Sequence, residues 1–154
     1  MAEGAISELG GGFEENVSVT RYLLDTGIAS DYIDRRNGVY QRARRAVAGG
    51  GRLGIAAPVL GELWTGIFNS TSREHNQRLL RRHRDHFAIW PFEENSAKEF
   101  GRIMAELIRI GRKMQQIDMQ IAAIALTLGN CIVVSKDGDL RAVPGLDVED
   151  WSQP

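Results

Sequence analysis

The chain alternates short apolar runs with longer segments whose apolar residues recur at helical spacing. Apolar runs of four to six residues bounded by turn formers predict β-strands. Pro91 lies near the end of one run and indicates a strand end or an edge strand, because proline cannot donate a hydrogen bond to a sheet. The predicted strands cover residues 21–24, 53–57, 87–92 and 131–135, with a short edge strand in 146–151.

The longer segments carry apolar stripes of helical period and predict helices. Two of them begin with the pattern of a capping box, Thr71 to Glu74 and Ser96 to Glu99. Pro58 suits the first turn of the helix that follows the second strand. The predicted helices span residues 28–36, 39–47, 58–68, 96–110 and 118–128, and one more opens at the capping box of Thr71 to Glu74 and runs to about residue 87.

Strands that alternate with helices predict right-handed crossovers and an α/β fold, with a mainly parallel sheet covered on both faces. One such domain, residues 21–151, takes up most of the chain, and residues 1–20, which contain Gly10 to Gly12, predict a flexible leader. Cys131 is the only cysteine and no apolar run could span a bilayer, so we expect a cytoplasmic protein without an internal disulfide or membrane contact.

Four acids stand at predicted strand ends or helix starts. Asp25 directly follows the first strand and Asp137 closely follows the strand at 131–135, so both emerge at the same edge of a parallel sheet. Asp118 begins the helix that leads into that strand, and Glu62 lies in the first turns of the helix after the second strand. From spacing alone, each acid also has an ordinary alternative as a helix cap, a turn former or a solvated helix residue.

If the four acids converge, their like charges repel one another unless a cation lies among them. Mg²⁺ is suited to such a site because it binds carboxylate oxygens while keeping waters and substrate phosphates in its shell. The chemistry that follows is hydrolysis of a phosphodiester by a metal-activated water. The formal net charge of −1 permits an acidic site if the remaining surface carries the arginines.

Five segments, taken in order, strengthen this hypothesis: YLLDT (22–26), PVLGELWTG (58–66), IDMQIAAIAL (117–126), VVSKDGDL (133–140) and VPGLDVEDW (143–151). Together they resemble a PIN-domain ribonuclease, and within that family most closely the VapC toxins of VapBC toxin–antitoxin modules. The resemblance implies a three-layer α/β/α sandwich with a central, mainly parallel sheet. It also implies a metal-dependent endoribonuclease that acts as the toxin of a type II toxin–antitoxin system.

By this resemblance, the catalytic and metal-binding residues are Asp25, Glu62, Asp118 and Asp137, and the cofactor is Mg²⁺ or Mn²⁺. Thr26 and Ser135 match the small hydroxyl positions beside the acids, from which they would orient the ligands. The implied partners are an RNA substrate, a cognate antitoxin whose C-terminal segment covers the cleft, and a second copy of the chain in a homodimer.

Three residues near the acids depart from the family pattern or complicate it. Gly27 and Lys136 stand where asparagine is common in these proteins. Lys136 is expected either to contact a phosphate or to neutralise part of the acidic cluster, which would alter metal affinity. Asp139 is close enough in sequence to compete with Asp137 for the fourth acidic position.

Other classes of protein fit less well. Asp25 to Gly27 also forms the Asp-Thr-Gly of retropepsin-like proteases, but the helical second half of this chain has no place in that all-β fold. A haloacid-dehalogenase-like phosphatase would need a second aspartate where Gly27 stands. A receiver-like Mg²⁺-binding domain remains an alternative on fold, as does a PIN-like regulatory domain that binds RNA or a partner without cleaving it, although retention of all four acids favours an enzyme.

The segment at 74–87 is rich in arginine and contains all three histidines, His75, His83 and His86. No cysteine or acid completes a zinc site with them, so we expect a solvated or RNA-facing surface. Its arginines could steer an RNA backbone, although charged helix faces are more often simply solvated. Apolar residues at 64, 67 and 68 are expected in the core, or else in a groove for the antitoxin or a dimer partner.

Overall fold

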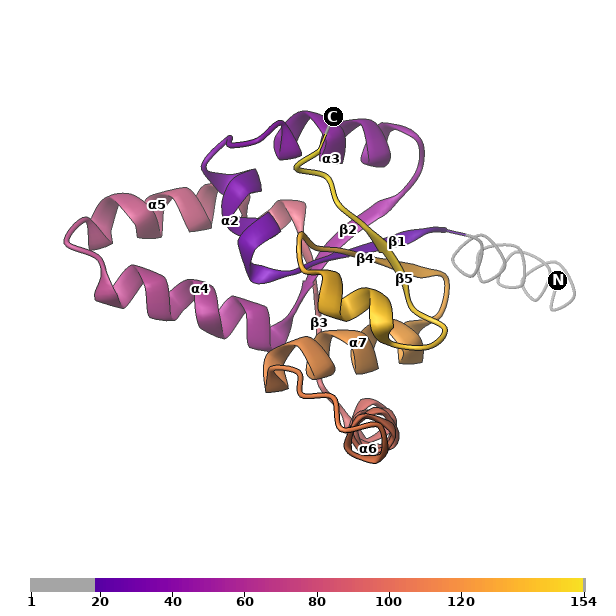
Figure 1. Ribbon diagram of the computed structural model, residues 1–154. Helices are drawn as coiled ribbons and strands as arrows, with labels where there is room; N and C mark the ends of the chain where they lie inside the picture. The colour runs from indigo at the N-terminus through magenta and orange to yellow at the C-terminus, as the bar shows by residue number, and fades with distance from the viewer. Residues whose placement is uncertain (1–18, 154) are drawn as a thin grey trace, which may run out of the picture.

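The computed structural model describes residues 19–153 and confirms the predicted α/β/α architecture (Figure 1). Within these residues, five strands form one sheet in the order β3-β2-β1-β4-β5, and every neighbouring pair is parallel. The fifth strand lies at an edge, as predicted, and the third both lies at the other edge and ends at Trp90, directly before Pro91. The strands are β1 (Arg21–Leu24), β2 (Arg52–Ala56), β3 (Ala88–Trp90), β4 (Cys131–Val134) and β5 (Asp147–Glu149).

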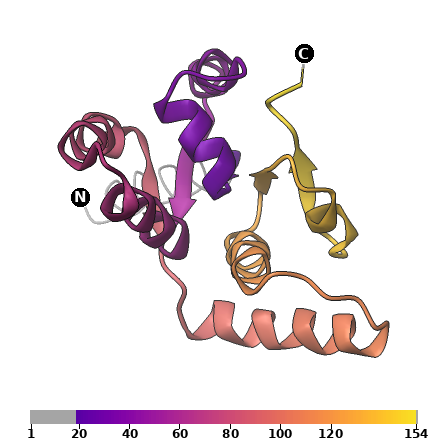
Figure 2. The same cartoon turned by 60° about the vertical axis from the view of Figure 1, so that its left-hand side comes forward.

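Helices cover both sides of this sheet. Helices α2 and α3 lie on one side of the strands, while α7 lies on the other and carries α6 on its outer surface (Figures 1 and 2). The hairpin of α4 and α5 projects from the sheet beyond β3 (Figure 1). The helices are α2 (Thr26–Ile33), α3 (Val39–Ala48), α4 (Ala57–Asn69), α5 (Arg73–His83), α6 (Glu94–Arg109) and α7 (Gln116–Leu128), with short 3₁₀ turns η1 (Arg84–His86) and η2 (Gly138–Ala142).

The centre of the core is the pair of strands β1 and β4. Leu23 and Leu24 of β1 are fully buried, as are Val133 and Val134 of β4, because helices cover the sheet on both faces. Small side chains on α7 let that helix approach the sheet closely, and Ala122 is fully buried there. Because burying apolar surface contributes about 25 cal/mol for each Å², these central strands are a main source of stability.

Both predicted capping boxes are wrong in detail. Helix α5 is capped at Ser72 rather than Thr71, and no side chain caps its first turn. Helix α6 begins at Glu94, so Ser96 is its third residue; the Ser96 hydroxyl accepts a hydrogen bond of 2.7 Å from the backbone N–H of Glu93. Ser96 therefore takes part in the cap of α6, but from the third position of the helix and not as the predicted N-cap.

The expectation that His83 and His86 face solvent or RNA is also wrong, because His83 is only 2% exposed and His86 is half-buried. His83 Nδ1 donates to the carbonyl of Leu79 at 2.8 Å, and the hydroxyl of the fully buried Tyr32 bonds His86 Nδ1 at 2.6 Å. Arg35 lies 3.2 Å above the ring centre of Tyr40 and contacts His83 Nε2 at 3.3 Å. We call Tyr32, Tyr40, His83, His86 and Arg35 the ring cluster.

The apolar residues of α4 divide between the two expected settings. Ile67 is buried in the core, whereas Phe68 is 58% exposed and stacks on Trp64 with ring centres 5.6 Å apart. The arginines of α5 at 78, 81 and 82 are exposed. Helix α4 therefore contributes to the core on one side and leaves an aromatic pair on the other.

The predicted leader falls almost entirely outside the described residues, and only Val19 and Thr20 of it can be placed. The carbonyl of Thr20 accepts a hydrogen bond of 2.9 Å from the backbone N–H of Arg52. None of the helices within residues 19–153 has the length and apolar character needed to cross a membrane.

Candidate active site

Asp25 lies at the carboxyl edge of the sheet, between the ends of β1 and β4. Its backbone N–H donates to the carbonyl of Val134 at 3.0 Å, and this bond extends the pairing of the two strands by one residue. Its side chain caps α2, because Oδ1 accepts a 2.8 Å hydrogen bond from the backbone N–H of Ile28. The ordinary role as a helix cap and a position in a carboxylate site are thus combined in one residue.

Ser135 connects Asp25 to the loop that follows β4. This buried hydroxyl donates to Asp25 Oδ2 at 2.5 Å and accepts a 2.9 Å hydrogen bond from the backbone N–H of Asp137. Burial raises the pKa of Asp25 above its ordinary value and the charge of Asp137 adds to this, although the hydrogen bonds from Ser135 and Ile28 act in the opposite direction. A single hydroxyl therefore fixes the relative positions of two of the four predicted acids.

Glu62 reaches the same edge from α4. The Thr26 hydroxyl donates to Glu62 Oε1 at 2.6 Å, so the residue next to Asp25 in sequence holds an acid that lies thirty-six positions further along the chain. The Glu62 side chain is exposed. Gly27 leaves space beside Asp25, because a Cβ atom added at this glycine would lie 3.8 Å from Asp25 Oδ1.

Asp118 lies in the first turn of α7, where the charges of the other acids act on its carboxylate. Its pKa is raised from the ordinary 3.8 to about 6, first by burial and then by four negative charges. In decreasing order of effect, these charges belong to Asp137, Asp25, Asp139 and Glu62. Four separate segments of the chain therefore bring acids to one edge of the sheet.

Asp137 and Asp139 differ in their partners. Asp137 caps η2 by accepting the backbone N–H of Asp139 at 2.9 Å, and its backbone is tied to Ser135. The Asp139 carboxylate forms an ion pair of 2.9 Å with Arg112 at the surface. Because Asp139 already has a cation of its own, Asp137 is the better candidate for the fourth acidic position.

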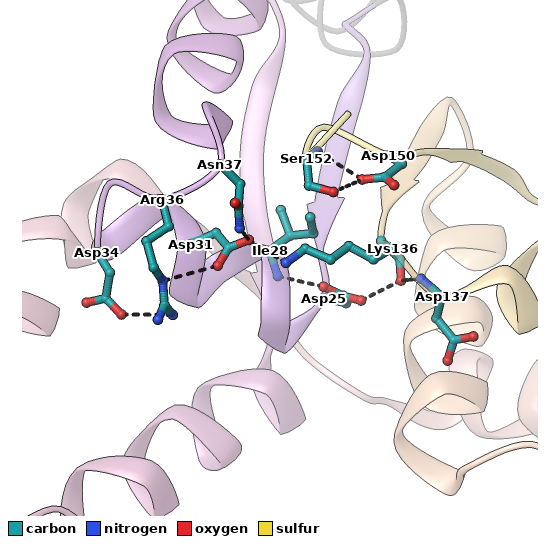
Figure 3. A network of polar contacts seen from close by, with 11 residues as sticks. Asp25, Ile28, Asp31, Asp34, Arg36, Asn37, Lys136, Asp137, Asp150 and Ser152 are labelled. Carbon is teal, nitrogen blue, oxygen red and sulfur yellow. Dashed lines mark hydrogen bonds and ion pairs between the residues drawn. The ribbon is translucent and has the colours of Figure 1, made fainter. Parts of the chain in front are cut away.

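Lys136 and Asp31 form a pair that the sequence did not indicate. The Lys136 side chain extends from the loop after β4 across to α2, where its Nζ lies 2.7 Å from Asp31 Oδ2 (Figure 3). Asp31 is only 4% exposed and also receives a 3.0 Å hydrogen bond from Asn37 Nδ2. A carboxylate on the buried face of a predicted helix, three residues after Ile28, was the available signal.

The donor chemistry of the four acids fits a hard divalent cation, since all the donors are carboxylate oxygens and their mutual repulsion already disfavours the charged form of Asp118. Within residues 19–153, however, no three acidic, histidine or cysteine side chains are grouped closely enough to hold an ion in this arrangement. The exposed Asp137 carboxylate is turned away from Asp25 (Figure 3). The acids thus surround the sheet edge without converging on one point.

An open cleft of about 310 Å³ adjoins these acids on the side of α4. Thr26 and Glu62 line it where it meets the carboxylates, and apolar residues of α4 and α5, among them Ile67 and Leu80, line the remainder. The edge of the sheet is therefore continuous with a surface that could accommodate a second molecule.

Comparison with known proteins identifies the fold and the family. The PIN domain family model matches residues 22–146. The tRNA(fMet)-specific endonuclease VapC of Shigella flexneri is 30% identical, and Ribonuclease VapC2 of Rickettsia felis is 26% identical; each match covers 86% of this chain and 98% of the relative. A crystal structure of VapBC2 from Rickettsia felis bound to promoter DNA aligns with a TM-score of 0.78 at 26% identity, covering 86% of this chain and 99% of that one. The chain belongs to the PIN domain family and, within it, to the VapC ribonucleases.

Proposed function

We propose that this protein is a metal-dependent endoribonuclease and the toxin of a type II toxin–antitoxin system. The observation that supports the proposal is the gathering of acids from four chain segments at the carboxyl edge of the sheet, where burial and then the charges of the other acids raise the pKa of Asp118 to about 6. Ligands of parallel α/β folds bind at this edge. The VapC relatives, which are named as ribonucleases, supply the reaction class.

Asp25, Glu62, Asp118 and Asp137 are the residues that would hold Mg²⁺ or Mn²⁺. A divalent ion bound there supplies a lowered pKa for a water molecule and charge compensation at the phosphate. Binding also removes the repulsion that Asp118 experiences. Holding an ion requires the exposed carboxylate of Asp137 to turn toward Asp25, and this side chain is at the surface.

The hydroxyl groups of the site orient the acids. Ser135 holds Asp25 Oδ2, which leaves Oδ1 bonded to the start of α2, and Thr26 holds one oxygen of Glu62. Carboxylates fixed in this way lose less conformational freedom when they bind a ligand. Ser135 and Thr26 thus orient Asp25 and Glu62 for binding.

A cognate antitoxin is the proposed protein partner, because the solved relatives include VapBC complexes. The cleft beside Thr26 and Glu62 and the exposed Phe68 together offer an apolar surface next to the acids. A homodimer in the cytoplasm completes the proposal. A transfer RNA is the first RNA to test, since one relative is named as specific for tRNA(fMet).

The test is cleavage of total RNA and of an initiator tRNA transcript by the purified protein with Mg²⁺ or Mn²⁺. We expect cleavage that EDTA abolishes and that Asp25→Asn lowers by at least about a hundredfold, since even residues that only orient metal ligands commonly contribute ten- to a hundredfold. Asp147→Asn is the matched control, because this exposed acid lies at the opposite, amino end of β5. Intact RNA with a folded wild-type protein would contradict the proposal and support a PIN-like or receiver-like domain that binds without cleaving.

A further inference from the structure

Lys136 and Asp31 form an ion pair whose two partners differ sharply in burial. The Lys136 side chain is 46% exposed, whereas that of Asp31 is 5% exposed. The other ion pair beside the acids, between Arg112 and Asp139, joins two exposed side chains and is expected to contribute little. The Lys136 ammonium is therefore held by a fixed carboxylate, while nearly half of the lysine side chain is open to solvent.

Asp31 is built to hold a cation in one place. Its Oδ2 accepts from both Lys136 and Asn37, and Arg36 Nε lies 3.4 Å from its Oδ1. Asn37 reaches it from a tight turn in which its own φ is +57°, a left-handed conformation that asparagine tolerates better than most residues. Burial acts to raise the pKa of Asp31, but the hydrogen bonds and positive charges of its partners outweigh burial and hold the pKa below its ordinary value.

The position of the ammonium connects this pair to the carboxylate site. Lys136 stands between Ser135 and Asp137 in the chain, and its side chain passes over Asp25 on the way to α2 (Figure 3). Its charge acts electrostatically on both Asp25 and Asp150. An ammonium has three donors, and Asp31 takes one of them.

A phosphodiester that enters a ring of carboxylates brings a further negative charge into it. Lysine is a compact charge that binds phosphate oxygens without the geometric demands of arginine. We propose that Lys136 binds a phosphate oxygen of the RNA substrate next to the scissile bond, and that Asp31 is the positioning residue that holds it there. This inference rests on the proposed function, and it adds a substrate-binding cation that belongs to the chain itself.

The direct test measures RNA binding in the absence of metal. The binding of a fluorescein-labelled oligouridylate is measured by fluorescence anisotropy in EDTA at several salt concentrations. Lys136→Met is expected to weaken binding about tenfold and to reduce the slope of log affinity against log salt by about 0.7, the value for one lost phosphate contact on a single strand. Lys136→Met leaves Asp31 with its partners Arg36 and Asn37, so we expect the fold to be retained. Lys98→Met, an equal charge change on the exposed face of α6, is the control.

Two further variants separate binding from positioning. Lys136→Arg should restore most of the salt slope, because it restores the charge. Asp31→Asn should leave the salt slope unchanged, since Lys136 remains, but lower kcat/KM for cleavage with Mn²⁺, since the ammonium is no longer fixed. Wild-type kcat/KM in Asp31→Asn would overturn the positioning role.

Equal affinity and salt slope in Lys136→Met and Lys98→Met would overturn the contact between Lys136 and phosphate. A wild-type protein that binds the oligouridylate in EDTA yet cleaves no RNA with Mg²⁺ or Mn²⁺ would contradict the proposed enzyme instead. Because the binding measurement contains no metal, the two failures are distinguishable.

Discussion

Helix α2 carries a polar group of a different kind at each end. At its start, Asp25 belongs to the carboxylate site; near its end, Tyr32 belongs to the ring cluster. In the ring cluster the buried donors meet acceptors. His83 Nδ1 must carry a hydrogen because it faces a carbonyl, which leaves Nε2 to accept from Arg35. In the carboxylate site, by contrast, acids face other acids, and their charges add to the effect of burial in raising the pKa of Asp118 to about 6.

This difference separates stability from function. Buried polar groups that satisfy one another strengthen a fold, and interacting groups of like charge weaken it unless a ligand compensates them. The buried members of the ring cluster, Tyr32 and His83, offer a ligand no unsatisfied polar atom, since no buried side-chain nitrogen or oxygen among residues 19–153 lacks a hydrogen-bond partner. The carboxylate site retains charge that a cation could use. Substitutions in the two places should therefore have opposite consequences.

Removing the centre of the ring cluster should produce the largest effect. Tyr32 is fully buried and packs against His83, His86 and Phe87, so Tyr32→Ala is expected to lower the free energy of unfolding by about 3 to 5 kcal/mol. Tyr32→Phe removes only the hydroxyl and should cost about 1 to 2 kcal/mol, because His86 loses its partner. Urea unfolding measures both. A Tyr32→Phe protein as stable as the wild type would contradict the structural role of this hydrogen bond.

Removing a charge from the carboxylate site should reduce RNA cleavage without reducing stability. Asp118→Asn is expected to reduce RNA cleavage by at least about a hundredfold. The same change should leave the metal-free protein as stable as the wild type or more stable, because it relieves repulsion from Asp137 and Asp25. Cleavage assays and urea unfolding in EDTA test the two halves separately. A loss of stability comparable to that of Tyr32→Ala would show that Asp118 supports the fold.

The periodicity of the chain predicted the elements well because the core imposes it. Leu23 and Leu24 in β1 and Val133 and Val134 in β4 are apolar on both faces, as expected of central parallel strands. The helix starts were less predictable. A serine can be the N-cap of a helix, or it can be the third residue and accept a hydrogen bond from the N-cap backbone. Ser96 has the second role, because the N-cap is Glu93, which lies before the predicted start.

The candidate site was predictable where an acid directly follows a strand and less so where helices supply the contacts. Asp25 and Asp137 could be placed at one edge from the strand order alone. The pairing of Thr26 with Glu62, and of Lys136 with Asp31, depends on the angle at which α4 and α2 meet the sheet. His83 was misplaced for a related reason: it continues the apolar stripe after Leu79 and Leu80, but its polar ring suggested a surface.

The pH dependence of stability provides the finest test of the comparison, because the two clusters should respond in opposite directions. Burial lowers the pKa of His86 from its ordinary 6.5, with further lowering by the charges of His83, Arg44 and Arg35. As the pH falls, His86 therefore takes up a proton more readily in the unfolded chain than in the native chain. Its contribution to stability is present above about pH 6.5 and is lost as the pH falls through its native pKa.

Asp118 has the opposite sign. Its native pKa of about 6 exceeds the ordinary 3.8. Between these two values the native chain holds a proton that the unfolded chain has lost. The contribution of Asp118 to stability is therefore present below pH 3.8 and is lost as the pH rises through about 6. The free energy of unfolding is measured with urea in EDTA at about pH 7.5 and about pH 5. Acidification should lower it in Asp118→Asn, where the effect of His86 remains. Acidification should raise it in His86→Asn, where the effect of Asp118 remains. The same pH dependence in both variants would mean that the clusters do not govern it. Because wild-type protein contains both groups, its own change should lie between those of the two variants.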